Sequence, residues 1–429
     1  MIIRQNYLDQ LIAYRDKPVI KIITGMRRCG KTAIMSLYND FLLEDGVKPD
    51  HIINMSFEMM EFDDITDYRQ MYALIKSKIP ATGKTYLLLD EIQMIKGWEK
   101  AVDSLYAEGV ADIYLTGSNS NLLSSEIATL LSGRYVIIKV LPLSFQEYLL
   151  FVLDRKQKEE RQYNSLRRSL RKDMDQEDNI ALDIKRYIRF GGLPTIPFLP
   201  QERSMVITYL EGVYNSVVVK DILANKVITN ILGLKKIIRY VAGSTGKVLS
   251  PKLVSDYFLA KYGDESFSYA NIATYIELLE KAYIFYSEDC YDLKQQAMVL
   301  DECKYYIADT GVRNTLLLFS DTGKGHNLET IVYFELLRRG YTVFWGKYGE
   351  CELDFYAVRQ EKKLCIQVAI NLKDEKLWEK KMRDLEALPS GYKKIFISMN
   401  RAYKNQAQDI KFLNLADFLL KQTYEYEEM

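Results

Sequence analysis

The chain has 429 residues, of which 48% are hydrophobic and 27% charged, and its 58 basic residues balance its 58 acidic ones. This is the composition of a globular protein with room for about two to four domains, and the absence of net charge excludes a general attraction to nucleic acid or to an anionic membrane. Five scattered cysteines and two histidines argue against a structural zinc site. No signal peptide opens the sequence and no apolar run approaches the ~18 residues of a membrane span, so we expect a cytoplasmic protein.

A phosphate-binding pattern, Gly-x-x-x-x-Gly-Lys-Thr, occupies residues 25–32 directly after the apolar run 19–23. A strand, a glycine-containing loop and a helix with inward-facing N–H groups together make a cradle for phosphate. Lys31 is expected to reach the β- and γ-phosphates of a nucleoside triphosphate, and Thr32 to offer its hydroxyl to Mg²⁺. We assign nucleotide contacts to Gly25, Arg28, Cys29, Gly30, Lys31, Thr32 and Ala33. Arg28 could instead brace the loop from outside.

Five strand-like runs before residue 145 alternate with helical or polar sequence, which predicts a parallel α/β sheet with its ligand site at the carboxyl ends of the strands. The runs cover residues 18–24, 51–57, 84–89, 111–116 and 135–140. The third run ends in Asp90 and Glu91. Asp90 is expected to hold Mg²⁺, and Glu91 to orient and deprotonate an attacking water. The pair extends the prediction from nucleotide binding to hydrolysis, although a solvated acidic turn is the alternative.

Three further residues are candidates for contact with the γ-phosphate. The fourth run is followed by Ser118 and Asn119, and either side chain, Asn119 before Ser118, can act as a sensor of the phosphate or the water; helix capping is the alternative. Arg134 opens the fifth run and is a candidate arginine finger, within one subunit or across an interface, or else a surface residue.

Five segments together resemble the prokaryotic AAA-type ATPase family, in which the ATPase domain is followed by a C-terminal domain of unknown function. The segments are 25–32, 88–93, 115–120, 133–135 and 141–145. The resemblance covers nearly the whole chain. It implies that ATP is the nucleotide and that the 111–116 strand lies between the phosphate-loop strand and the strand ending in Asp90.

The rest of the chain reads as three further parts after an ATPase core at 1–150. We predict a helical connector at 151–231, a winged helix-turn-helix at 232–300 and a nuclease-like α/β domain at 301–429. The connector contains a basic stretch at 161–172, which either contacts phosphate or is an exposed, solvated segment. Gly191-Gly192 marks a sharp turn further along the connector.

The predicted winged helix consists of three helices and a ribbon. The first helix covers 234–240, the second begins at Ser250 and the third begins at Ser268. The ribbon pairs 284–286 with 291–293. The third helix can enter a DNA major groove, but its charges are chiefly acidic, so contact with a protein is the alternative.

The C-terminal pattern is helix, three strands, helix and strand, which resembles the PD-(D/E)xK nuclease superfamily in element order. In that order Glu329, Asp354 and Gln367 occupy the places of metal-binding acids. The resemblance also implies a lysine two residues after the third of these positions, where this chain has Ala369. We therefore expect a module without cleavage activity.

The prediction from the whole sequence is a Mg²⁺-dependent ATPase whose nucleotide state controls its C-terminal domains. The alternatives are an ATP-gated partner-binding module with negligible turnover and, third, an ATP-regulated DNA nuclease. Oligomerisation is left open.

Overall fold

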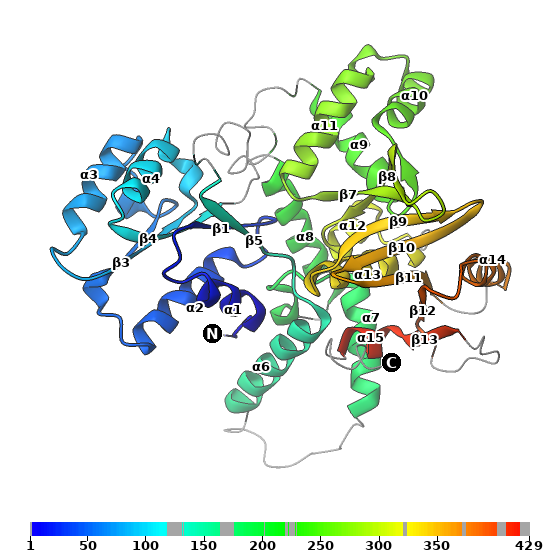
Figure 1. The fold of residues 1–429 in the computed structure, drawn as a ribbon, viewed down its shortest axis with the longest axis horizontal. Helices are drawn as coiled ribbons and strands as arrows, with labels where there is room; N and C mark the ends of the chain where they lie inside the picture. The colour runs from blue at the N-terminus through cyan, green and yellow to red at the C-terminus, as the bar shows by residue number, and fades with distance from the viewer. Residues whose placement is uncertain are drawn as a thin grey trace. The chain divides into compact units, whose positions relative to one another are not determined.

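The computed structural model describes residues 2–117, 131, 133–163, 176–200, 202–218, 222, 228, 230–320, 324–370, 375–400 and 409–420 (Figure 1). The chain divides into two compact units. Unit 1 comprises Met1–Pro142 with Lys281–Tyr283, and unit 2 comprises Leu143–Glu280 with Ile284–Met429.

Unit 1 is built on a five-stranded parallel sheet in the order β2-β3-β4-β1-β5. Its strands are β1 (Ile20–Thr24), β2 (Ile52–Ser56), β3 (Thr85–Asp90), β4 (Ala111–Gly117) and β5 (Tyr135–Lys139). All five predicted strands are present, and β4 lies between β1 and β3 as the family resemblance implied. Because the strands are parallel, their carboxyl ends meet at one edge, where Ser56 pairs with Asp90 and Ile23 with Thr116.

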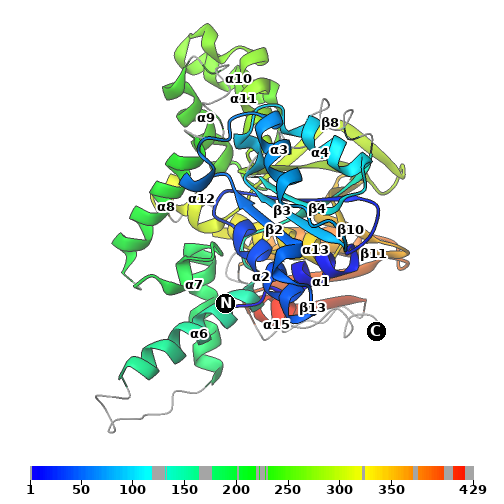
Figure 2. The ribbon, with the colours of Figure 1, turned by 90° about the vertical axis from the view of Figure 1, so that its left-hand side faces the viewer.

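Helices cover both faces of this sheet (Figures 1 and 2). They are α1 (Gln5–Ala13), α2 (Lys31–Glu44), α3 (Tyr68–Lys78) and α4 (Trp98–Ala107). Alternate strand residues such as Ile22, Leu87 and Leu115 join Met71 and Val102 of α3 and α4 in one buried apolar cluster. On the other face, α2 packs against β3 and β4. The central strands β1, β3 and β4 are buried on both faces, which explains their nearly continuous apolar runs. The outer strands β2 and β5 have exposed residues.

Unit 2 contains an eight-stranded mixed sheet in the order β13-β12-β11-β10-β9-β7-β8-β6. The strands are β6 (Val248–Leu249), β7 (Phe285–Asp292), β8 (Ala297–Ile307), β9 (Thr342–Tyr348), β10 (Cys351–Arg359), β11 (Lys362–Ala369), β12 (Lys393–Ser398) and β13 (Ile410–Asn414). Its helices are α6 (Phe145–Tyr163), α7 (Gln176–Phe190), α8 (Arg203–Val217), α9 (Ile231–Gly243), α10 (Pro251–Tyr262), α11 (Tyr269–Lys281), α12 (Thr310–Leu316), α13 (Lys324–Arg338), α14 (Glu375–Glu386) and α15 (Leu415–Leu420).

Two predicted boundaries in this part differ from the structure. The segments 284–286 and 291–293 were expected to pair with each other, but the single strand β7 covers most of both and pairs with β8 instead. The expected domain boundary at 300/301 falls inside β8, and β7 pairs with β9 in a parallel manner, so one sheet runs through both regions. Sequence signals mark turns, whereas long-range strand pairing decides which turns separate domains.

The Gly191-Gly192 turn is fixed by a buried carboxylate. Asp309 accepts hydrogen bonds from the backbone N–H of Gly192 at 2.7 Å and of Val312 at 3.0 Å. Gly191 has φ +82°, and a Cβ there would lie 2.1 Å from Asp309 Oδ1, so this position requires glycine. Burial raises the pKa of Asp309 to about 6, against the opposing effect of these hydrogen bonds.

Candidate functional site

The phosphate loop connects β1 to α2 and ends at Gly30, which caps the helix in a left-handed conformation with φ +101°. A side chain at that φ would be strained, which accounts for the glycine. Helix α2 begins at Lys31, so the first N–H groups of the helix face the loop. The loop therefore has the geometry of an anion cradle.

The loop is held against the segment that follows β5. Gly25 has φ +146°, and a Cβ there would lie 2.1 Å from the carbonyl oxygen of Val140. The guanidinium of Arg4, 3% exposed, donates to the carbonyl oxygens of Cys29 at 2.9 Å and Leu141 at 3.0 Å. Glycine is needed at 25 for this close approach as well as for its φ.

Lys31 carries the positive charge of the cradle. Its side chain is 4% exposed, and Nζ donates to the carbonyl oxygens of Gly25 at 3.1 Å and Met26 at 3.3 Å. These carbonyls hold the ammonium inside the loop, where a bound phosphate would meet it.

Thr32 and Asp90 meet in the same place. The Thr32 hydroxyl lies 3.1 Å from each carboxylate oxygen of Asp90, and Ser56 Oγ donates to Asp90 Oδ2 at 3.0 Å. All of these groups are oxygens, the donors that a hard divalent cation such as Mg²⁺ prefers. The donor set fits a magnesium ion that completes its shell with phosphate oxygens and water.

Thr116 joins the two acidic residues. Its hydroxyl donates to Asp90 Oδ1 and accepts a hydrogen bond from the backbone N–H of Glu91 at 3.0 Å. One hydroxyl at the end of β4 therefore fixes the Asp90 carboxylate and the Glu91 backbone together.

Glu91 adopts a left-handed conformation, with φ +54°, and is 7% exposed. A non-glycine residue in this region costs about 1–3 kcal/mol and persists only where its surroundings hold it. Gln93, in the 3₁₀ turn Ile92–Met94, donates from Nε2 to Glu91 Oε2. Both the backbone and the carboxylate of Glu91 are thus held by hydrogen bonds.

The other predicted nucleotide contacts have different positions. Arg28 is exposed and has φ +68°, and Ala33 is exposed in the first turn of α2. Cys29 is fully buried, and burial raises its pKa, so it packs in the loop as a neutral thiol. Ser118 and Asn119 lie outside the described residues.

Arg134 lies at the amino-terminal ends of the strands β1 and β5, whereas the phosphate loop lies at the carboxyl end of β1. Its carbonyl accepts from the backbone N–H of Ile20, the first residue of β1, whereas the phosphate loop follows Thr24 at the other end of that strand, ~15 Å away. Its guanidinium pairs with Asp103 at 3.6 Å and lies over the Tyr106 ring. The structure does not bring Arg134 to the phosphate loop of its own chain, so a finger role within one subunit is wrong.

Sequence reasoning missed three polar side chains of this site: Ser56, Gln93 and Thr116. Ser56 and Thr116 could have been found, because a hydroxyl at the end of a strand next to β3 must lie beside Asp90. Gln93 could not, since its contact depends on the unusual φ of Glu91.

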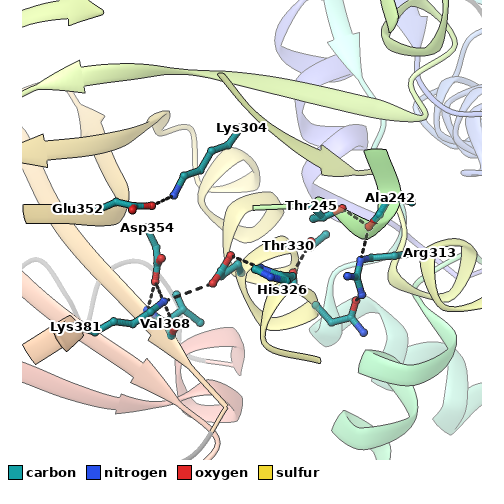
Figure 3. A network of polar contacts seen from close by, with 12 residues as sticks. Ala242, Thr245, Lys304, Arg313, His326, Thr330, Glu352, Asp354, Val368 and Lys381 are labelled. Carbon is teal, nitrogen blue, oxygen red and sulfur yellow. Dashed lines mark hydrogen bonds and ion pairs between the residues drawn. The ribbon is translucent and has the colours of Figure 1, made fainter. Parts of the chain in front are cut away.

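Unit 2 holds a second cluster of charged side chains, shown in Figure 3. Lys381 of α14 donates to Asp354 Oδ2 of β10 at 2.5 Å and to the carbonyl oxygen of Val368 at 2.7 Å, and lies 3.5 Å from Glu329 of α13. His326 Nδ1 lies 3.2 Å from Glu329 Oε2. The cluster lines a pocket of about 640 Å³.

Burial and pairing compete in this cluster. Burial alone would lower the pKa of Lys381, but Asp354 and Glu329 outweigh it, and the pKa of Lys381 is raised. The ammonium is therefore charged and neutralises part of the two carboxylates. The Lys304 ammonium pairs with Glu352 at 2.6 Å beside them.

The third strand ends in Gln367-Val368-Ala369 and has no lysine there, which is why the sequence predicts a module without cleavage activity. In the structure α14 supplies a lysine, Lys381, from a different element. The prediction about cleavage stays a prediction. Gln367 Nε2 donates to the carbonyl of Glu352 at 2.6 Å, and its buried Oε1 has no partner among the described residues. The described residues contain no group of three or more His, Cys, Asp or Glu side chains that could hold a metal ion.

Residues 17–149 match the family model of an AAA domain, and residues 181–323 match a domain of unknown function, DUF8612. The phosphate loop, the sheet order and this match define the N-terminal part as a P-loop ATPase domain of AAA type. The chain belongs to the family of a Haemophilus influenzae protein described as uncharacterized, which is 33% identical over 423 residues, 98% of this chain and 99% of the relative.

Other proteins are similar to this chain, among them one relative and one solved structure from archaea. An uncharacterized protein of Methanocaldococcus jannaschii is 29% identical over 380 residues, 86% of this chain and 79% of the relative. The solved structure of a Walker-type ATPase of Pyrococcus abyssi has a TM-score of 0.50 and 15% identity and covers 74% of this chain and 96% of that one, which is a likeness of fold. Among the described residues, no helix combines the length and apolar character that crossing a bilayer requires.

Proposed function

We propose that the protein is a Mg²⁺-dependent ATPase whose nucleotide state switches its C-terminal part. The observation that carries the proposal is the convergence of Lys31, Thr32 and Asp90 on one side of the phosphate loop, with Glu91 next to them. The matched AAA domain and the P-loop fold support ATP as the nucleotide.

Each residue has a separate part in the proposed reaction. The loop N–H groups and Lys31 would bind the phosphates, and Thr32 and Asp90 would hold Mg²⁺. Glu91 orients a water and accepts its proton as the water attacks the γ-phosphorus, while the bond from the γ-phosphorus to the β–γ bridging oxygen breaks and ADP leaves. Mg²⁺, when bound, neutralises charge on the β- and γ-phosphates. Asn119, with Ser118 as second choice, is the proposed sensor, and Arg134 is proposed to act on the site of a second copy.

The switch is proposed to start at the loop itself. Val140 and Leu141 contact the phosphate loop through Gly25 and Arg4, and they lead covalently into unit 2, which begins at Leu143. Hydrogen bonds that form to a γ-phosphate and break on hydrolysis would therefore act on the chain segment that enters unit 2.

The test separates binding from turnover. Lys31→Ala should abolish ATP binding in calorimetry, Glu91→Gln should bind ATP and release no phosphate, and Lys48→Ala, at a position of unit 1 outside the site, should behave as wild type. Hydrogen exchange in unit 2 should change with Mg²⁺–ATP in Glu91→Gln and stay unchanged in Lys31→Ala. Wild-type turnover in Glu91→Gln would refute the assigned base. Binding without turnover in the wild-type protein would favour an ATP-gated binding module.

We propose that a partner macromolecule binds helices α9–α11, the segment in which the sequence predicts a winged helix. Glu277 is exposed on α11, so this helix does not present the basic face that DNA attracts. A protein partner is accordingly the first choice, and DNA the second. Titration of duplex DNA at several salt concentrations distinguishes them, because DNA binding must weaken steeply with salt.

A second candidate function is hydrolysis of a phosphodiester in the unit 2 pocket. It is favoured by one observation, the lysine that α14 places between Asp354 and Glu329, which could stabilise negative charge on a phosphate. Plasmid cleavage with Mg²⁺ or Mn²⁺, lost in Lys381→Met and retained in the control Lys380→Met, would support this function. No cleavage by the wild-type protein would exclude it.

A further inference from the structure

The side chain of Gln93 contacts the carboxylate of Glu91, the proposed general base. Gln93 follows Glu91 by two residues, and its amide N–H donates to Oε2 of the Glu91 carboxylate. The opposite orientation of the amide would place two oxygen atoms together, so only this orientation gives a hydrogen bond. Gln93 Oε1 is buried and accepts no hydrogen bond in the described part of the chain.

Two independent contacts fix Glu91 from different sides. Thr116 holds the backbone N–H, and Gln93 holds one carboxylate oxygen, while the backbone φ of Glu91 is in the left-handed region. A glutamate side chain has three rotatable bonds, and a general base must lie within about 3 Å of the proton that it removes. Without Gln93, the Thr116 contact would fix the backbone of Glu91 but not its carboxylate.

We propose that Gln93 is a positioning residue for hydrolysis, which holds the Glu91 carboxylate in the orientation that activates the attacking water. This inference rests on the proposed role of Glu91 as the base. It assigns Gln93 no contact with the nucleotide, so its removal acts on the chemical step and leaves ATP affinity unchanged.

The test uses Gln93→Met, which keeps the length of the side chain and removes the amide. Turnover should fall by about 10- to 100-fold, the range found for residues that orient a reacting group, while KM for ATP and the melting temperature stay within error of wild type. The matched control is Gln5→Met, because Gln5 also donates from its amide to a carboxylate, that of Asp9 at 2.7 Å, at an exposed site of unit 1.

A double-mutant cycle shows whether Gln93 acts through Glu91. In Glu91→Asp the carboxylate is one carbon shorter, so the Gln93 amide no longer meets it, and Gln93→Met should then cause no further loss of turnover. An equal loss in both backgrounds, a raised KM, or wild-type turnover in Gln93→Met would overturn the inference while Glu91→Gln remains inactive. Wild-type turnover in Glu91→Gln would instead overturn the proposed function itself.

Discussion

Thr32 and Asp90 are 58 positions apart in the chain, and the hydroxyl of the first lies 3.1 Å from both carboxylate oxygens of the second. The contact is possible because β1 and β3 are parallel and flank β4, so that the loop after β1 and the end of β3 reach the same edge. It places a neutral and an anionic oxygen where a cation bound to phosphate would need them.

The first prediction concerns Thr32. Thr32→Val removes the hydroxyl and keeps the shape, so the Mg²⁺ concentration needed for half-maximal phosphate release should rise at least about tenfold. ATP binding measured in EDTA should change little, because Lys31 and the loop N–H groups remain. Ser36→Ala, one turn further along α2, is the control, because its hydroxyl donates to the Thr32 carbonyl oxygen. An unchanged Mg²⁺ requirement in Thr32→Val would contradict the assignment.

Thr116 should matter for both stability and turnover. Thr116→Val leaves the buried N–H of Glu91 without its acceptor, which should lower the free energy of unfolding by about 1–3 kcal/mol. Turnover should fall because Asp90 and Glu91 lose their common partner. Thr85→Val is the matched control, since Thr85 is also buried in a strand of the same sheet but its hydroxyl has no partner among the described residues. Urea unfolding and phosphate release should separate the two variants.

Arg134 should act between subunits or have no catalytic role. If it acts on the site of a second copy, Lys31→Ala and Arg134→Ala chains should each be inactive alone and regain activity when mixed, because one supplies the arginine and the other an intact loop. The loss in Arg134→Ala should reach about 10³-fold or more for a finger. Full activity of Arg134→Ala, or no recovery on mixing, would show it to be the partly exposed partner of Asp103.

The buried carboxylate of Asp309 predicts a pH dependence. Its folded-state pKa, about 6, lies above the usual 3.8, so the folded protein binds this proton more tightly. Its contribution to stability is therefore complete below pH 3.8 and is lost as pH rises through 6, by about 3 kcal/mol in all. Asp309→Asn cannot ionise, so its melting temperature relative to wild type should rise between about pH 4 and pH 6 and change little above about pH 7. A difference that is independent of pH would contradict the assignment.

The N-terminal unit could be predicted in detail, and the C-terminal unit only in outline. Strands β1, β3 and β4 are largely buried, so their apolar runs and the polar residues after them are visible in the sequence. The strands β7 and β8 are harder to predict from the sequence. Residues 287–290 were interpreted as a turn, but they lie inside β7, which pairs with the following strand β8. The elements β13 and α15 were not predicted at all.

Features that depend on neighbours along the chain could be read directly from the residues: a glycine loop before a helix, a lysine and threonine at that helix start, and two acids after a buried strand. These features are local, since backbone conformation and helix ends are set by a few adjacent residues. Which distant side chains share a site depends instead on the three-dimensional fold. It placed Thr116 between Asp90 and Glu91, moved Arg134 to the far edge of the sheet, and supplied Lys381 from a helix where the strand has alanine. Such contacts depend on strand order and helix packing, which no short stretch of sequence encodes.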